Sequence, residues 1–182
     1  KMSPRMAWRA ITSVLPKDAI ISSDIGNNCA IGNAYPTFEE GRKYLAPGLF
    51  GPCGYGFPAI CGAKIAQPDV PVVGFAGDGA FGISMNEMVS VGRDEWPPIT
   101  MIIFRNYQWG AEKRNTTLWF DDNFVGTELD TDVTYAGIAQ QCGVKGVQVD
   151  GMDALAEALD KAIEAQMKDK VTTFIEVVLN QE

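Results

Sequence analysis

The sequence predicts an α/β domain with three layers, in which a mostly parallel sheet lies between helices. Short apolar runs that end in turn residues alternate with longer segments of helical periodicity along the whole chain. The apolar runs carry no alternating polar residues, which is typical of strands buried on both faces, as in parallel sheets. Because no repeat or composition shift divides the 182 residues, we expect a single domain.

Strands are expected where the apolar runs occur, at residues 19–24, 71–76, 99–104, 145–149 and 172–179. Helices are expected from Pro4, which follows a Ser3 N-cap, from near Pro58, and over residues 85–94, 133–142 and 153–167. The helix over residues 85–94 is predicted from Ser84 and Glu87, which match a capping box. Residues 35–50 and the polar segment 111–130 are expected to be irregular.

Composition excludes several classes of function. The net charge of −8 disfavours nucleic acid and anionic membranes as partners, and no apolar run is long enough to span a bilayer. The chain has no histidine, which excludes histidine metal sites and Ser-His or Cys-His nucleophiles within it. The four cysteines form no CxxC pair and the first residues lack the apolar core of a signal peptide, so we expect reduced thiols and a cytoplasmic protein.

One carboxylate, Asp78, stands between Gly77 and Gly79 directly after the apolar run 71–76. In open α/β sheets, ligands bind beyond the carboxyl ends of the strands, and this acid is predicted to lie at such an end. Glycines allow a sharp turn and a close approach of the backbone to a ligand. The helix that follows suits a phosphate. Because an acid repels a phosphate, we expect a hard divalent cation between the two.

The next apolar run, 99–104, ends at Asn106 and Gln108. A neighbouring parallel strand places its carboxyl end beside that of the strand before Asp78. An asparagine side-chain oxygen and a backbone carbonyl are neutral ligands that complete an oxygen shell without adding negative charge. A glycine-flanked acid or a strand-end asparagine alone is usually a turn residue, but the two together predict a metal and phosphate site.

These residues resemble a known family. The GDG motif around Asp78, followed one βα unit later by Asn106 in RNYQWG, looks like the cofactor motif of thiamine-diphosphate-dependent enzymes. The upstream GPCGYGFPAICGA is similar to the segment that precedes this motif in the acetolactate-synthase-like branch. Three longer segments, which begin at Phe38, Gly74 and Phe104, look like the sulfoacetaldehyde acetyltransferases.

The resemblance implies roles for particular residues. Asp78, the Asn106 side chain and the Gln108 carbonyl would bind Mg²⁺. The diphosphate of thiamine diphosphate would lie against Gly77, Gly79, Ala80 and Phe81, and against a turn formed by Gly26, Asn27 and Asn28. The Gly51 carbonyl would accept a hydrogen bond from the aminopyrimidine. Cys53 stands where the family has a bulky residue that props the cofactor into its bent form; a buried structural thiol is the alternative.

The resemblance also implies that residues 1–182 are the diphosphate-binding domain, a C-terminal fragment of a longer chain. In the family, the glutamate that activates the cofactor comes from a separate pyrimidine-binding domain, usually on another subunit. No catalytic residue is therefore assigned within this chain, a homo-oligomer is expected, and the fragment by itself is predicted to be inactive.

The implied substrates are sulfoacetaldehyde and phosphate, which give acetyl phosphate and sulfite. Both are anions, so cations near the metal segment are candidates to bind them: Lys113 and Arg114 first, then Arg105, Arg42 and Lys43. Each of these is otherwise an exposed loop charge. Four aromatic residues are candidates to wall the site: Tyr107, Trp109, Trp119 and Phe120. Two other functions stay open: an acetolactate synthase or related 2-oxoacid carboligase, and a noncatalytic phosphate- or nucleotide-binding module.

Overall fold

Six parallel strands form one sheet in the computed structural model, which describes residues 2–38, 41 and 43–181. The strands lie in the order β2-β1-β3-β4-β6-β5. Their bounds are β1 (Ile20–Ser23), β2 (Tyr44–Leu45), β3 (Val72–Gly77), β4 (Thr100–Arg105), β5 (Lys145–Val149) and β6 (Thr173–Val178). The predicted parallel sheet is confirmed, and only the short β2 lies in a segment predicted to be irregular.

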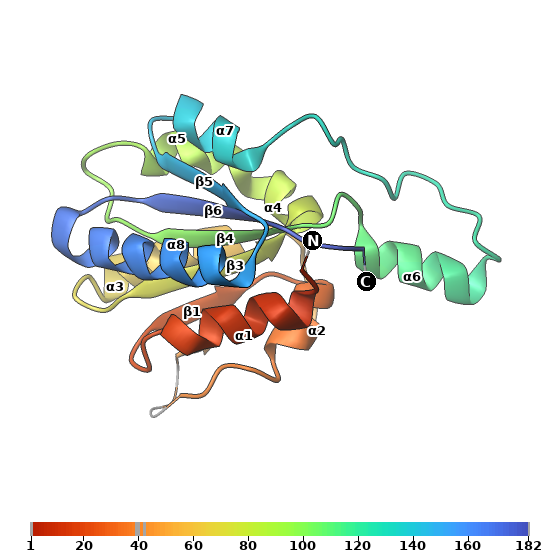
Figure 1. Cartoon of the computed structure of the whole chain (residues 1–182), viewed down its shortest axis with the longest axis horizontal. Coiled ribbons are helices and arrows are strands. Elements are labelled where there is room, and N and C mark those ends of the chain that lie inside the picture. The colour runs from red at the N-terminus through yellow and green to blue at the C-terminus, as the bar shows by residue number, and fades with distance from the viewer. Residues whose placement is uncertain (1, 39–40, 42, 182) are drawn as a thin grey trace.

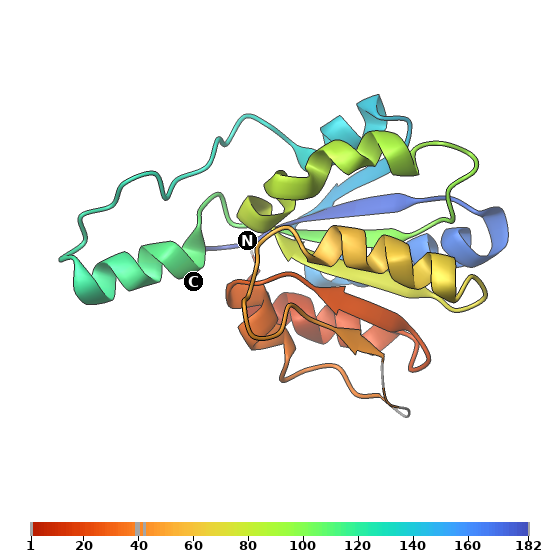
Figure 2. The same cartoon turned by 180° about the vertical axis from the view of Figure 1, so that it is seen from behind.

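Helices cover both faces of this sheet, so the three predicted layers are present (Figures 1 and 2). One face carries α1 (Pro4–Val14) and α8 (Met152–Glu164). The other carries α3 (Gly56–Ala66), α4 (Asp78–Ser84), α5 (Met88–Val91) and α7 (Tyr135–Gln141). The remaining elements are α2 (Asn27–Gly32), α6 (Gly110–Trp119), a 3-10 turn η1 (Met85–Glu87) and a π-helical segment η2 (Ala165–Asp169).

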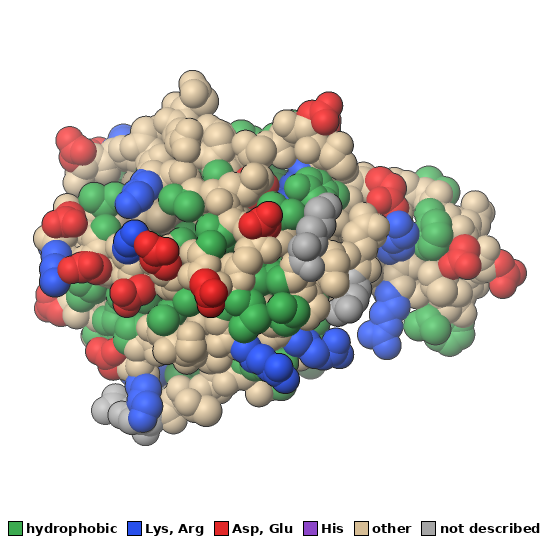
Figure 3. All heavy atoms as spheres, in the orientation of Figure 1, with side chains coloured by type: hydrophobic (Ala, Val, Ile, Leu, Met, Phe, Trp, Pro, Cys, Tyr) green, Lys and Arg blue, Asp and Glu red, His purple; other side chains and the backbone are tan. Residues whose placement is uncertain are grey.

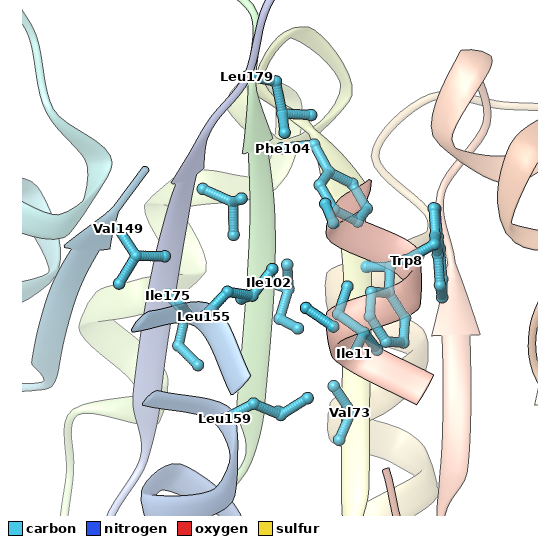
Figure 4. Close-up of a cluster of buried hydrophobic side chains, with 14 of the residues drawn as sticks. Trp8, Ile11, Val73, Ile102, Phe104, Val149, Leu155, Leu159, Ile175 and Leu179 are labelled. Atoms are coloured by element: carbon cyan, nitrogen blue, oxygen red, sulfur yellow. The ribbon is translucent and has the colours of Figure 1, made fainter. Parts of the chain in front are cut away.

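Two buried clusters hold the layers together. On the first face, Trp8 and Ile11 of α1 and Leu155 and Leu159 of α8 pack against the strands (Figure 4). On the second face, the ring of Phe81 on α4 lies among the rings of three residues from other elements, Phe57, Tyr135 and Phe174. The predicted start of the first helix is confirmed, because the Ser3 side chain accepts a hydrogen bond from the Met6 amide.

The helix predicted over residues 85–94 begins seven residues earlier than expected, since α4 starts at Asp78. The predicted capping box is wrong. The Ser84 hydroxyl is buried and has no hydrogen-bond partner among the described residues, and the Glu87 carboxylate accepts from Asn86 and Ser90 instead. The strand leads directly into the helix, with Gly77 as the N-cap in an extended conformation.

The polar segment 111–130 is not wholly irregular, because its first part forms α6. None of the ten residues of α6, all of which the structure describes, is buried. The helix therefore has no apolar face whose periodicity the sequence could reveal. With the segment that follows it, α6 projects away from the sheet (Figures 1 and 2). No helix in the described part of the chain is long and apolar enough to cross a membrane.

Candidate cofactor site

A cavity of about 180 Å³ lies at the carboxyl ends of β1, β3 and β4. Every residue that the sequence predicts for cofactor or metal binding lines it, with the exception of Phe81: Gly26, Asn27, Asn28, Gly51, Cys53, Gly77, Asp78, Gly79, Ala80, Asn106 and Gln108. The parallel register explains this, because Gly77 at the end of β3 pairs with Phe104 near the end of β4. Segments far apart in the sequence thus meet at one edge of the sheet.

The predicted substrate cations do not reach this cavity. Lys113 forms an ion pair with Glu128 and lies over the ring of Phe124, while Arg114 is exposed on α6. Within the described residues, the cavity lining includes no lysine or arginine, and Lys43 lies outside it. Arg42 lies outside the described residues. Phe81 keeps its ring in the core, so only its main chain remains for a contact with a cofactor.

Asp78 is held in one orientation by hydrogen bonds. Its Oδ2 atom accepts from the Tyr107 amide at 2.7 Å and from Arg105 Nη1 at 3.1 Å, and its Oδ1 atom accepts from the Gly79 amide at 3.0 Å. The Tyr135 hydroxyl donates to the Asp78 carbonyl at 2.9 Å. Burial raises the pKa of the Asp78 carboxyl, and the Tyr107 amide and Arg105 guanidinium oppose that shift.

Three oxygen atoms face one another beside this carboxylate. Asn106 Oδ1 lies 3.2 Å from Asp78 Oδ1 and 3.0 Å from the Gln108 carbonyl oxygen, and it accepts from the Gln108 amide at 3.3 Å. If the Asn106 side-chain amide is turned, its nitrogen donates to both of those oxygens instead. Oxygens that share a face of a Mg²⁺ octahedron lie about 3 Å apart, because each Mg–O distance is about 2.1 Å. The separations of Asn106 Oδ1 from the other two predicted ligand atoms therefore match those around a small divalent cation.

The backbone around Gln108 completes this arrangement. Tyr107 has φ +63°, a left-handed conformation that is rare for a bulky residue and is often found at functional sites. This turn lets the Tyr107 amide reach Asp78 while the Gln108 carbonyl faces Asn106. The buried Gln108 Oε1 atom has no hydrogen-bond partner among the described residues. An orphaned acceptor beside three clustered oxygens fits a site for a cation and its ligands.

No group of three or more His, Cys, Asp or Glu side chains in the described ranges could hold a metal. A cation at Asp78 would thus depend on one carboxylate with amide and carbonyl oxygens, as the sequence predicts. The helices α2 and α4 both begin at the cavity, and their N-caps are the glycines Gly26 and Gly77. A glycine at the N-cap has no side chain to cap the first-turn N–H groups, although in α4 the Gly79 amide already donates to Asp78 Oδ1.

The need for glycine at position 79 has a structural cause that the sequence did not reveal. A Cβ atom at this position would lie 2.8 Å from the indole ring of Trp109, which is tighter than a real contact. The indole therefore packs directly on the Gly79 backbone. By contrast, a Cβ at Gly77 would meet its nearest neighbour, Asn28 Oδ1, at an ordinary 3.4 Å. Of the two glycines, Gly79 is required by the protein itself.

Asp24 is a second feature that the sequence analysis missed. It follows β1 and is fully buried, and its carboxylate accepts hydrogen bonds from the backbone amides of Ile25, Gly54 and Gly56 at 2.9, 3.0 and 2.7 Å. Burial raises the pKa of Asp24, while these amides lower it. The bonds hold the 51–56 turn, which carries Gly51 and Cys53, against the end of β1. An acid directly after an apolar strand was the signal for it.

Cys53 is exposed on the cavity side of this turn, so the alternative of a buried structural thiol is wrong. Partial desolvation within the cavity and the nearby carboxylates of Asp24 and Glu112 raise the pKa of the Cys53 thiol, which keeps it protonated. Glu112, in the first turn of α6, also lines the cavity. Its carboxylate, like that of Asp78, makes the described lining acidic rather than basic.

The fold and the cavity are those of an α/β domain that binds a ligand at the carboxyl ends of its strands. The family described as thiamine pyrophosphate enzyme, C-terminal TPP binding domain, matches residues 24–177, and the chain belongs to this family. The predicted cofactor residues from Gly26 to Gln108 and the strands β2 to β5 lie within the matched range, whereas β1 precedes it and β6 ends one residue beyond it.

Within this family, the chain is most similar in sequence to one group among the curated relatives described here. The probable sulfoacetaldehyde acetyltransferase of Rhizobium meliloti (strain 1021) is 76% identical over 182 residues, which are 100% of this chain and 31% of that protein. The sulfoacetaldehyde acetyltransferase of Rhodobacter capsulatus is 72% identical over 181 residues, 100% of this chain and 30% of that protein. The acetolactate synthase large subunit of Haemophilus influenzae is more distant, at 26% identity over 99% of this chain and 31% of its own length.

A solved structure shows the same fold. The thiamine diphosphate-dependent 4-hydroxybenzoylformate decarboxylase of Rhodococcus jostii RHA1 superposes with a TM-score of 0.88 over 98% of this chain and 32% of that one, at 24% identity. The chain therefore spans about a third of the length of the proteins it matches.

Proposed function

We propose that this chain is the cofactor-binding domain of a sulfoacetaldehyde acetyltransferase, which converts sulfoacetaldehyde and phosphate to acetyl phosphate and sulfite. The observation that carries the proposal is the cluster of three facing oxygens at Asp78, Asn106 and Gln108, because it fits Mg²⁺ at the cavity of a thiamine-diphosphate-binding fold. The identity of 72–76% to sulfoacetaldehyde acetyltransferases supports the choice of reaction over the more distant acetolactate synthases.

In this proposal, thiamine diphosphate supplies the reactive carbon and the electron sink, and the chain supplies position and charge. Asp78, Asn106 and the Gln108 carbonyl hold the cation that neutralises the diphosphate. Gly26 and Gly77, the N-caps of α2 and α4, let the phosphate oxygens approach the first turns of these helices. Trp109 covers Gly79 and walls the cavity beside them. The Asp24 carboxylate fixes the turn that presents Gly51 and Cys53 to the rest of the cofactor.

The cavity is too small to enclose the whole cofactor. Its volume of about 180 Å³ is below the roughly 300–1,000 Å³ of typical ligand pockets, and its described lining offers no cation for a sulfonate or phosphate substrate. We infer that a pyrimidine-binding domain of another subunit closes the site and supplies both the activating glutamate and the substrate cations. A homo-oligomer in the cytoplasm follows from this proposal.

The exposed arm formed by α6 and residues 120–125 supports such a partner. Leu118, Trp119 and Phe120 are 62%, 77% and 66% exposed, and Figure 3 shows hydrophobic side chains on the arm. A ten-residue helix is marginal in water without packing, and this one buries nothing against its own domain. A surface outside this domain is needed to stabilise it.

The reaction is tested with the full-length protein, thiamine diphosphate and Mg²⁺. We expect sulfite and acetyl phosphate from sulfoacetaldehyde and phosphate, and loss of both products when EDTA removes the cation. The 182-residue fragment under the same conditions is expected to give no turnover. Acetolactate from pyruvate without sulfite release would favour the carboligase instead. Binding of a nucleotide, with no Mg²⁺-dependent affinity for thiamine diphosphate in calorimetry, would favour the noncatalytic module.

A further inference from the structure

Arg105 is a buried arginine that joins the metal-ligand carboxylate to three other parts of the fold. Its Nη1 atom donates to Asp78 Oδ2 at 3.1 Å. Its Nη2 atom donates to the Asp130 carbonyl and, at 3.2 Å, to the Val133 carbonyl. Its Nε atom lies 3.6 Å from the carboxylate of Glu176 on β6. The side chain is 2% exposed, so it cannot act as the surface cation expected for an anionic substrate.

These contacts give the two carboxylate oxygens of Asp78 different surroundings. Oδ2 accepts from Arg105 Nη1 and from the Tyr107 amide. Oδ1 accepts from the Gly79 amide alone, at 3.0 Å, and faces Asn106 Oδ1 at 3.2 Å. A carboxylate with both hydrogen-bond directions of one oxygen filled cannot turn that oxygen toward a cation without losing them.

Glu176 forms a buried ion pair with the guanidinium, at a separation too long for a hydrogen bond. Its Oε1 atom faces Arg105 Nε, and its Oε2 atom accepts from the Ala136 amide at 3.0 Å. The central carbon of the guanidinium also lies over two aromatic rings, 4.3 Å from the centroid of Tyr107 and 5.1 Å from that of Tyr135. A buried planar group with hydrogen bonds and two ring contacts has little freedom to move.

We propose that Arg105 is a positioning residue for the cation site: it locks Asp78 so that a single oxygen, Oδ1, is presented to the metal. The inference rests on the proposed function, because it takes the oxygen cluster to be a metal site. Arg105 itself touches neither the cation nor the substrate. Hydrogen-bond partners of metal ligands typically change metal affinity 10- to 100-fold when they are removed.

If only the charge of Arg105 mattered, its removal would have the opposite effect on divalent-cation affinity, so the two explanations can be separated by experiment. A guanidinium within a few ångströms of a cation site repels the cation, so removing that charge should tighten divalent binding if charge alone mattered. Lysine separates the two effects, because it keeps the positive charge but lacks the planar fork that donates to Asp78 and Asp130 at once. Positioning therefore predicts weaker binding in Arg105→Lys, where charge predicts no change.

The test uses full-length protein with saturating thiamine diphosphate, and Mn²⁺ as the probe, with free Mn²⁺ measured by electron paramagnetic resonance. We expect the Mn²⁺ dissociation constant of Arg105→Lys to rise about tenfold. The turnover number should recover at saturating Mg²⁺, since excess cation restores the occupancy of the weakened site by mass action. The matched control is Arg93→Lys, which alters an exposed arginine paired with Glu95 and should leave the Mn²⁺ constant unchanged.

Arg105→Lys with an unchanged or smaller Mn²⁺ constant would overturn the inference, and so would a lost activity that excess Mg²⁺ fails to restore in a folded variant. If Arg105→Lys does not fold, Glu176→Gln replaces it, because glutamine keeps an acceptor for the Ala136 amide and removes the charge beside Nε. A rise of a few fold is then expected, and no rise contradicts the proposal. Failure of the wild-type protein to bind Mn²⁺ would instead reject the proposed function.

Discussion

Two glycines at the cavity are required for different physical reasons. Gly26 adopts φ +117°, which a residue with a Cβ rarely adopts, so its backbone conformation requires glycine. Gly79 has no unusual φ, and the Trp109 ring is what excludes a side chain there. The sequence placed Asp78 and Asn106 at one site because both follow apolar strands. It could not reveal the contact between Gly79 and Trp109, because that contact depends on how α6 leaves the sheet.

The substitution Gly79→Ala tests this contact. A Cβ 2.8 Å from the Trp109 ring forces the indole or α4 to move, so we expect the full-length protein to lose about 1–3 kcal/mol of stability and to bind thiamine diphosphate more weakly. Thermal unfolding and calorimetric titration measure the two effects. The control is Gly62→Ala on the exposed side of α3, where nothing lies within 4 Å, and it should be neutral or slightly stabilising. Equal behaviour of both variants would contradict the explanation.

At the scale of elements, β1 and the turn before α3 are joined by side chains at the end of the strand. Asp24 accepts from two amides of that turn, Gly54 and Gly56, and the Ser22 hydroxyl of β1 donates to the Gly56 carbonyl at 2.6 Å. A Cβ at Gly56 would lie 2.8 Å from the Phe75 carbonyl, so the turn lies directly against β3 as well. Sequence periodicity predicts the strands and helices themselves, but it carries no information on which turn each strand end receives.

We therefore expect Asp24→Asn to loosen the 51–56 turn. The amide nitrogen faces backbone donors, so at least one buried hydrogen bond is lost, at a cost of about 1–3 kcal/mol. Hydrogen exchange should become faster at the Gly54 and Gly56 amides, and the affinity for thiamine diphosphate should fall. Asp160→Asn on the exposed face of α8 is the control. Unchanged exchange at both amides would show that Asp24 does not hold the turn.

In the whole molecule, the edge of the sheet at the carboxyl ends of its strands is only partly covered. The cavity is small and its described lining is acidic, and α6 exposes apolar residues beside it. The segment 111–130 was predicted to be an irregular loop because it has no apolar periodicity, yet its first ten residues form a helix without a buried face. These features agree with a domain whose partner surface lies outside the 182 residues.

The arm is tested by Trp119→Glu in the full-length protein. Trp119 is 77% exposed in this domain, so the variant should keep its secondary structure in circular dichroism. A charge buried at the subunit interface is costly, so we expect a smaller oligomer in light scattering and reduced activity. Ile65→Glu, which alters another exposed apolar residue on α3, is the matched control and should keep the native mass. A native mass for Trp119→Glu would remove the arm from the interface.

The sequence by itself determined the parallel α/β fold and the family, and its predicted cofactor residues line the cavity with the exception of Phe81. Strand burial and strand-end chemistry are local patterns, and Asp78, Asn106 and Gln108 could be read from them. Only the tertiary structure decided how these residues are held. Three contacts join segments far apart in the chain: Arg105 with Asp78, Asp24 with the turn before α3, and Trp109 with Gly79. Such pairings follow from packing and strand order rather than from local sequence patterns.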